Sequence, residues 1–250
     1  MTRPAVLLIA ATDSSGGAGL TRDVRVLTDF GVDALCAVTA VTAQSDQRVA
    51  AVHHVPPEVV QSQIAAALET RRLGAVKIGM LGDRATLEAV TDSLAHIAAV
   101  PIVVDPVLVS SSGGILLDTP GRTALLEKLL PRATLVTPNV PEVAALLGEP
   151  VAADEAGLIA QGQRLLTFGC QAILLKGGHA SGEAAVDWLI APSGSVHRIT
   201  SERVSGSSRG TGCALASGIA AGLASGLSLL EACRRAKSYV LEAMLTPESL

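Results

Sequence analysis

The amino-acid sequence predicts an α/β protein with a mostly parallel central sheet and helices on both of its faces. Short apolar runs, which are typical of buried strands, alternate along the 250 residues with segments whose apolar residues recur at helical spacing. This alternation is typical of βαβ units. The chain contains no internal repeat and no long linker, so we expect residues 1–250 to form a single domain.

Most of the chain follows this alternation closely. The strands expected from short apolar runs lie at residues 6–10, 35–41, 75–78, 102–104, 135–137 and 172–175. The helices expected from apolar residues at helical spacing lie near residues 20–30, 57–71, 84–98, 120–130, 141–147 and 154–168.

A different pattern near the C-terminus predicts antiparallel strands. Apolar runs at 185–190 and 196–199 flank Pro192, Ser193 and Gly194. Two strand-like runs joined by such a short turn segment are a hairpin signal. We therefore expect antiparallel strands near one edge of the sheet.

Residues 211–230 carry no charge and are about long enough to span a bilayer. Gly226 is a helix-stop signal, however, and Ser228 with Glu231 forms the pattern of a capping box that opens a second helix. We therefore expect two helices of a folded domain here and no membrane span.

The composition argues against a nucleic-acid-binding protein. Only 2% of the residues are aromatic, and the formal net charge is −4 with no run of Lys or Arg, so neither base stacking nor phosphate binding is favoured. The four cysteines form no C-x-x-C pair, and the apolar run that ends before Asp13 is too short for a signal peptide. We expect a reduced, cytoplasmic protein that binds neither nucleic acid nor membrane.

Polar residues follow three of the expected strands. Asp105 comes after the strand at 102–104, Asn139 after the next strand, and Lys176 after the strand that follows. In an open parallel sheet, ligands bind at the carboxyl ends of the strands. These side chains would gather there and offer a cation for phosphate and oxygen ligands for Mg²⁺. Taken one at a time, each has an ordinary structural explanation as a turn or surface residue.

The segment Gly210, Thr211, Gly212 and Cys213 opens an uncharged helix. Free N–H groups at a helix start attract negative oxygen, and the glycines allow close approach of a ligand. A helix start lowers the pKa of a thiol at this position, and the thiolate form is then favoured. The segment therefore predicts an anion hole with a possible base, as phosphoryl transfer requires. The alternative is that Cys213 is a buried apolar residue, as free cysteines commonly are.

Two further segments are candidates for substrate contact. Residues 13–19 are rich in glycine and follow the first strand, but they match no nucleotide-binding fingerprint. Asp23, in the first turns of the following helix, would face the same pocket. Gln44 follows the second strand, and its carboxamide can match the donor and acceptor of an aminopyrimidine edge. A strand-to-helix turn and a surface glutamine are the structural alternatives.

Asn139 and Glu142 have two compatible interpretations. An asparagine followed three residues later by a glutamate is a sound helix-capping pattern. The same helix start would lie at the carboxyl end of a strand, so Glu142 would also lie close to Mg²⁺.

These segments together resemble the hydroxymethylpyrimidine/phosphomethylpyrimidine kinases of thiamine biosynthesis, within the ribokinase-like superfamily. The matching segments occur in the family's order and cover nearly the whole chain. They are residues 13–19, 41–44, 77–81, 105–107, 137–139 with Glu142, 175–179 and 210–213.

The resemblance implies a ribokinase-like fold, phosphorylation of 4-amino-5-hydroxymethyl-2-methylpyrimidine with ATP and Mg²⁺, and a homodimer. The residues implied for the aminopyrimidine are Gln44, Asp23 and Met80. Lys176 would meet the ATP phosphates, with Asp105, Asn139 and Glu142 on the Mg²⁺ side. The implied anion hole is Gly210, Thr211 and Gly212, with Cys213 as the base.

The chain departs from the family pattern at several positions. Ala11 replaces a glycine, Thr21-Arg22 replaces a glutamine–alanine pair and makes the pocket rim more cationic, and Ser208-Arg209 replaces a threonine–histidine pair. The chain also ends at Leu250, without the family's glycine- and histidine-rich tail. These departures bear on substrate choice and on the second phosphorylation, of the monophosphate. The alternatives are a pyridoxal- or pyridoxine-type kinase and a non-catalytic pyrimidine-binding sensor.

Overall fold

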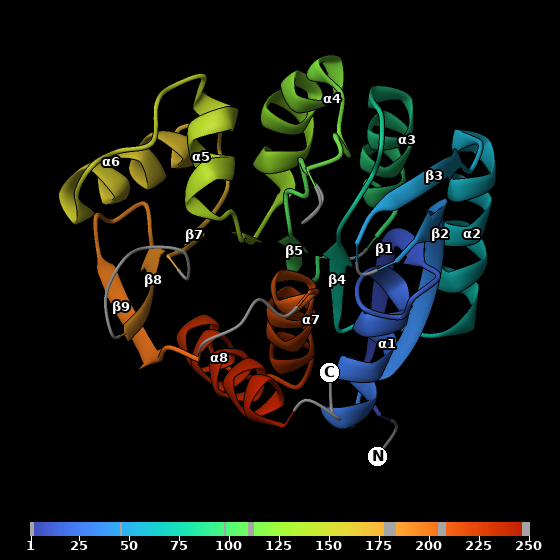
Figure 1. Ribbon diagram of the computed structural model, residues 1–250. Coiled ribbons are helices and arrows are strands. Elements are labelled where there is room, and N and C mark those ends of the chain that lie inside the picture. Colours follow the sequence, from blue (N-terminus) through green and yellow to red (C-terminus); the bar gives the residue numbers. More distant parts are fainter. Residues whose placement is uncertain are drawn as a thin grey trace.

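A nine-stranded sheet forms the centre of the computed structural model, which describes residues 3–45, 47–97, 99–109, 113–177, 184–204 and 209–246 (Figure 1). Within these ranges the strand order is β3-β2-β1-β4-β5-β6-β7-β8-β9. The strands are β1 (Ala5–Asp13), β2 (Asp33–Gln44), β3 (Val49–His54), β4 (Ala75–Ile78), β5 (Ile102–Val104), β6 (Leu135–Val136), β7 (Ile173–Lys176), β8 (Ala184–Ile190) and β9 (Val196–Glu202).

The helices cover both faces of this sheet (Figure 1). The α-helices are α1 (Gly19–Asp29), α2 (Pro57–Thr70), α3 (Arg84–Leu94), α4 (Thr119–Ala124), α5 (Val140–Leu147), α6 (Glu155–Leu166), α7 (Thr211–Ala224) and α8 (Leu229–Leu245). A π-helical turn, η1 (Leu125–Leu129), and a 3₁₀ turn, η2 (Leu130–Arg132), continue α4. No helix within the described ranges has the length and apolar content needed to cross a membrane.

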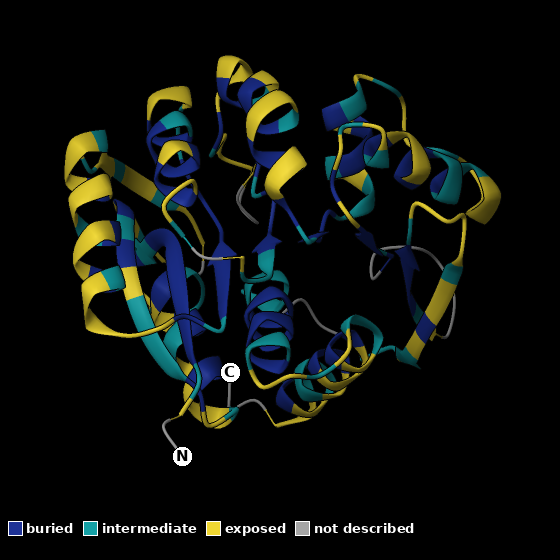
Figure 2. Ribbon diagram, turned by 180° about the vertical axis from the view of Figure 1, so that it is seen from behind, coloured by how far each residue is buried: buried dark blue, intermediate teal, exposed yellow. Residues whose placement is uncertain are grey.

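Two apolar cores lie on opposite faces of the sheet. Because side chains alternate along a strand, Leu7 and Ile9 of β1 contribute to the core beneath α2 to α6. Val6 and Leu8 contribute to the other core, beneath α1, α7 and α8. Figure 2 shows the parallel strands β1, β4, β5, β6 and β7 as mostly buried, as expected for a parallel sheet covered by helices, whereas β3 and β9 at the two edges are mostly exposed or intermediate.

The predicted fold class is confirmed. Strands β2, β1, β4, β5, β6 and β7 are parallel neighbours, and β8 and β9 form the expected antiparallel pair at one edge. The capping box of Ser228 and Glu231 opens α8, and Gly226 follows α7 with a φ of 86°. The antiparallel strand β3 at the other edge was not predicted, and Gln44 is the last residue of β2 rather than part of a loop beyond it.

Candidate active site

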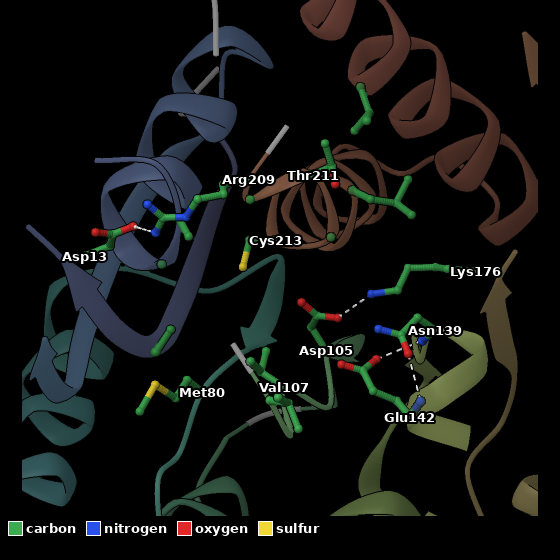
Figure 3. Close-up of a pocket in the computed structure, with 18 of the residues that line it drawn as sticks. Asp13, Met80, Asp105, Val107, Asn139, Glu142, Lys176, Arg209, Thr211 and Cys213 are labelled. Carbon is green, nitrogen blue, oxygen red and sulfur yellow. Dashed lines mark hydrogen bonds and ion pairs between the residues drawn. The ribbon is translucent and has the colours of Figure 1, made fainter. Parts of the chain in front are cut away.

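A cavity of about 1050 Å³ lies at the carboxyl ends of the parallel strands. Polar residues at the ends of β1, β5 and β7 reach it, and so does the N-terminus of α7 (Figure 3). Ten of the eleven predicted site residues line it: Gln44, Met80, Asp105, Asn139, Glu142, Lys176, Gly210, Thr211, Gly212 and Cys213. The prediction that distant segments of the chain meet at one edge of the sheet is therefore confirmed.

Asp105 and Lys176 form an ion pair at the ends of β5 and β7. The Lys176 Nζ lies 2.9 Å from Asp105 Oδ1, and the Thr137 hydroxyl donates to the same oxygen at 3.1 Å. Burial opposes the charge on Asp105, but Lys176 and Lys77 outweigh burial and lower the pKa of the carboxyl. The opposing carboxylates in turn raise the pKa of Lys176 above its ordinary value, against the effect of burial. Both groups are therefore charged and face the cavity.

Asn139 and Glu142 form the predicted capping box at the start of α5. Asn139 Oδ1 accepts from the Glu142 N–H at 2.8 Å, and Glu142 Oε2 accepts from the Asn139 N–H at 2.8 Å. Burial raises the pKa of Glu142 to about 7, with Asp105 adding to the effect and Lys176 opposing it. The helix start thus presents a second carboxyl group beside Asp105 (Figure 3).

The N-terminus of α7 is shaped by glycine. Gly210, its N-cap, has a φ of 76°, and a Cβ at this position would collide with the Gly17 carbonyl oxygen. No described side chain caps α7, α1 or α2, whereas α3, α4, α5, α6 and α8 each have a side-chain cap. Because the uncapped N–H groups at the start of α7 border the cavity, they can bind an anion there.

Cys213 lies between these groups, and its sulfur points into the cavity (Figure 3). Burial raises the pKa of the thiol to about 11, although Lys77 and a hydrogen bond from the Gly19 backbone lower it. The prediction that the helix start would favour the thiolate is therefore wrong. The physical reason is that burial disfavours the charged thiolate more strongly than Lys77 and the Gly19 N–H stabilise it.

Asp23 does not belong to the pocket, which corrects the prediction that it faces substrate. Its side chain is fully buried and is not among the described residues that line the cavity. The carboxylate pairs with the Lys77 Nζ at 2.6 Å and accepts from the Ser217 hydroxyl at 2.7 Å. The Asp23 charge raises the pKa of Lys77 to about 12, against the lowering effect of burial. Asp23 therefore holds Lys77, which itself lines the cavity.

Gln44, the last residue of β2, and Met80, which follows β4, both line the cavity. The Gln44 backbone is bound to the Ser14 hydroxyl at 2.9 and 2.8 Å, which ties the end of β2 to the glycine-rich turn. Its Oε1 accepts from Thr42 Oγ1 at 3.3 Å. Met80 packs with Ala11 and Ala40 in a small apolar cluster. This side of the cavity offers an amide and an apolar surface, which suits a flat heteroaromatic ring.

Comparisons with known proteins agree with this geometry. The family model described as "Phosphomethylpyrimidine kinase" matches residues 13–250. The chain is 40% identical over 245 residues to the hydroxymethylpyrimidine/phosphomethylpyrimidine kinase of Rhizobium meliloti, with 98% of this chain and 91% of that protein covered. The chain belongs to the phosphomethylpyrimidine kinase family.

Solved structures place this family member among the ribokinase-like kinases. The phosphomethylpyrimidine kinase of Clostridium difficile superposes with a TM-score of 0.85 at 33% identity, covering 97% of this chain and all (100%) of that one. The pyridoxal kinase of Staphylococcus aureus, solved with AMP-PCP and pyridoxal, superposes with a TM-score of 0.89 at 28% identity, covering 98% of this chain and 88% of that one. The predicted fold and enzyme class are thereby confirmed.

The positions where this family member departs from the pattern have distinct environments. Ala11 is buried and lines the cavity beside Met80. Arg22 is only 5% exposed and contacts the Gly17 carbonyl, so the prediction of a more cationic pocket rim at this residue is wrong. Arg209, by contrast, lines the cavity. Ser208, Gly178 and His179 lie outside the described residues.

Two ion pairs in the cavity wall were missed from the sequence. Lys237 of α8 pairs with Asp187 of β8 at 2.6 Å, and Arg209 pairs with Asp13 at 2.8 Å. A signal for Lys237 was present, because it lies four residues after Cys233 on the apolar face of its helix. No short-range pattern links Arg209 to Asp13, because they are far apart in the sequence.

Proposed function

We propose that this chain transfers the γ-phosphoryl group of ATP to the hydroxymethyl oxygen of 4-amino-5-hydroxymethyl-2-methylpyrimidine, and then to the monophosphate so formed, as a kinase of thiamine biosynthesis. One observation carries the proposal. The Cys213 thiol and the uncapped start of α7 lie between a cavity wall suited to an aminopyrimidine and a wall that carries Lys176 and two carboxyl groups.

On the acceptor side, Gln44 would hydrogen-bond the amino group and ring nitrogen of the pyrimidine, and Met80 would pack against the ring. The hydroxymethyl group then points toward Cys213. This placement brings the reacting oxygen next to the N–H groups of Gly212 and Cys213, where negative charge is stabilised.

On the donor side, Lys176 would bind the ATP phosphates, and Asp105, Glu142 and Asn139 would face Mg²⁺. The described residues contain no cluster of three or more His, Cys, Asp or Glu side chains that could hold a metal. Two carboxyl groups nevertheless fit Mg²⁺, which is commonly held by one or two carboxylates together with substrate phosphates and water. When bound, the ion neutralises phosphate charge.

The ion pair between Lys176 and Asp105 holds both groups in place before the nucleotide binds. With a nucleotide bound, the Lys176 ammonium would turn to the phosphates, and the Asp105 carboxylate would then be available to hold Mg²⁺. In the transfer, the bond between the γ-phosphorus and the bridging oxygen breaks and ADP leaves. The substrate oxygen forms the new bond, and the Cys213 thiolate takes its proton.

Product analysis tests this function. The purified chain is incubated with Mg·ATP and, separately, with the pyrimidine alcohol, its monophosphate, pyridoxal and pyridoxine, and the products are identified by mass. We expect the pyrimidine monophosphate and diphosphate, with one ADP formed for each transfer. Binding of the pyrimidine without any phosphorylated product would instead indicate a sensor.

The pyridoxal-type kinase remains the second candidate, because the Staphylococcus aureus pyridoxal kinase shares the fold so closely. Replacing Gln44 with Ala separates the two. If the aminopyrimidine is the substrate, Gln44→Ala lowers kcat/KM for it by about tenfold or more through the lost hydrogen bonds. Equal turnover of pyridoxal and the pyrimidine by the unmodified chain would contradict the proposed specificity.

A further inference from the structure

Cationic side chains line the cavity on both sides of Cys213. Lys176 lies on one side, and Arg209 lies on the other, next to Asp13 (Figure 3). Lys176 belongs to the wall with Asp105 and Glu142, which faces the nucleotide in the proposed function. Arg209 belongs to the opposite wall, formed by the end of β1 and the glycine-rich turn at residues 14–18.

The guanidinium of Arg209 is held in a fixed position. Its Nη2 donates to Asp13 Oδ2 at 2.8 Å, and its Nη1 donates to Ser15 Oγ at 3.2 Å. The other oxygen of Asp13 accepts from the Ser15 N–H at 2.9 Å and from the Ser15 hydroxyl at 2.8 Å. The Arg209 side chain is 14% exposed, so it borders the cavity while its position is set by the turn.

The sequence position of Arg209 adds a second constraint. It directly precedes Gly210, the N-cap of α7, and its guanidinium passes over Gly17 on the acceptor side. A negative group bound to the first N–H groups of α7 therefore lies beside Arg209 as well. An arginine presents five N–H donors in a plane, so it can keep Asp13 as a partner and still donate to phosphate oxygens.

We propose that Arg209 binds the phosphate of a phosphorylated acceptor and thereby makes the second transfer possible. This inference rests on the proposed function. The reacting oxygen must lie beside Cys213 in both transfers. In the second transfer that oxygen belongs to a phosphate group, which is then placed at the start of α7, between Arg209 and the donor phosphates.

The chemistry explains why a second cation is needed. In the second transfer, a non-bridging oxygen of the acceptor phosphate bonds to the γ-phosphorus, the bond from that phosphorus to ADP breaks, and a diphosphate ester forms. When the acceptor is a monoanion, its proton goes to the Cys213 thiolate. Two anionic phosphates must approach each other in this step but not in the first, because the first acceptor is a neutral alcohol. Lys176 and Arg209 on opposite sides of the contact reduce this repulsion.

Steady-state kinetics with both acceptors tests the proposal. We expect Arg209→Gln to raise KM for the pyrimidine monophosphate about 10- to 100-fold, as for a lost charge-assisted contact, and to change kcat/KM for the alcohol less than about threefold. Arg209→Lys keeps the charge without the planar guanidinium, and its KM for the monophosphate should fall between the values of the unmodified chain and of Arg209→Gln. Arg84→Gln, at an exposed position that is not among the described residues lining the cavity, is the matched control and should change neither value.

A purely structural role for Arg209 makes a different prediction. If the ion pair only ties the turn to α7, then Arg209→Gln and Asp13→Asn impair both acceptors equally and lower the melting temperature together, and the proposal is overturned. It is also overturned if Arg209→Gln leaves the monophosphate KM unchanged. If Arg209→Gln does not fold, calorimetric titration of Arg209→Lys with the monophosphate tests the proposal instead. An affinity equal to that of the unmodified chain would exclude recognition of the phosphate by the planar guanidinium.

The same data separate this inference from the proposed function. If the unmodified chain phosphorylates neither acceptor, the proposed function fails. If it phosphorylates the alcohol and leaves the monophosphate unreacted, the proposed function holds for the first transfer and the role of Arg209 is refuted.

Discussion

Lys77 and Asp23 are oppositely charged side chains that are both fully removed from solvent. Taking such charges out of water costs several kcal/mol per ion, and their mutual attraction offsets the cost only while both are present. The pair lies close enough to Cys213 for both charges to influence its pKa, and it connects β4, α1 and, through Ser217, α7. We therefore interpret the pair as the support that holds this part of the cavity wall, including Cys213, in position.

This interpretation predicts the stability of three variants in urea unfolding. Lys77→Met alone should cost about 3–5 kcal/mol of unfolding free energy, because it leaves a buried carboxylate without its cation. Adding Asp23→Leu to Lys77→Met should recover most of that loss. Glu88→Ala, which breaks exposed ion pairs with Arg84 and Lys128, is the control and should change the unfolding free energy far less than Lys77→Met does. Equal losses in the single and double variants would exclude an energetic role for the pair.

The position of Asp23 could have been predicted from the sequence. It falls three residues after Leu20 and four before Leu27, and both leucines are buried, so Asp23 lies on the apolar stripe of α1. A carboxylate on such a stripe is expected to face the core with a partner. Asp105 and Lys176 were correctly placed at the carboxyl end of the sheet, because each follows an apolar run that predicts a buried strand. The raised pKa of Cys213 was not predictable, because desolvation depends on the packed surroundings.

At the scale of elements, α7 and α8 approach each other closely because α7 carries glycine at the contact. A Cβ at Gly222 would lie 3.0 Å from the Cβ of Ala232, and one at Gly218 would lie 3.1 Å from that of Ala236. Small residues on both helices thus allow the backbones to pack tightly. This packing fixes the direction of α7 and with it the position of Cys213.

We expect Gly222→Val to lower the unfolding free energy by about 1–3 kcal/mol, because the added side chain has no space against α8. The matched control is Ala66→Val at an exposed position of α2, which carries only the small helix-propensity cost of a β-branched residue. Thermal unfolding of both variants measures the difference. A Gly222→Val protein as stable as the control would show that the two helices can separate without cost.

Element prediction succeeded where burial is strong and failed at the edge. The expected ranges 75–78 and 102–104 coincide with β4 and β5, because a short run of apolar residues in the middle of a parallel sheet has no competing interpretation. Strand β3 was missed because most of its residues are exposed, so it shows no apolar alternation. Its pairing with β2 is a tertiary effect.

At the scale of the whole molecule, the site arises from the order of the strands. The parallel strands β1, β4, β5, β6 and β7 end at one edge, so Asp13, Met80, Asp105, Asn139 and Lys176 come together although they span most of the sequence. Helix α7 then brings Cys213 to the same edge from the face opposite α5. This arrangement places the proposed acceptor and donor walls on either side of one thiol.

The central claim is that this thiol takes the proton during transfer, and the pH dependence of kcat/KM tests it most directly. The Glu142 carboxyl, with a pKa of about 7, is ionised above pH 8, whereas the Cys213 thiol, with a pKa of about 11, is still mostly protonated. The thiolate fraction therefore rises about tenfold per pH unit in this range. We predict that kcat/KM for the pyrimidine alcohol rises in parallel between pH 8 and about pH 9.5, and that Cys213→Ala lowers kcat about 10²- to 10⁴-fold and abolishes the rise. A flat profile in the unmodified chain, or a Cys213→Ala variant with the same rising profile and near-normal kcat, would contradict the account.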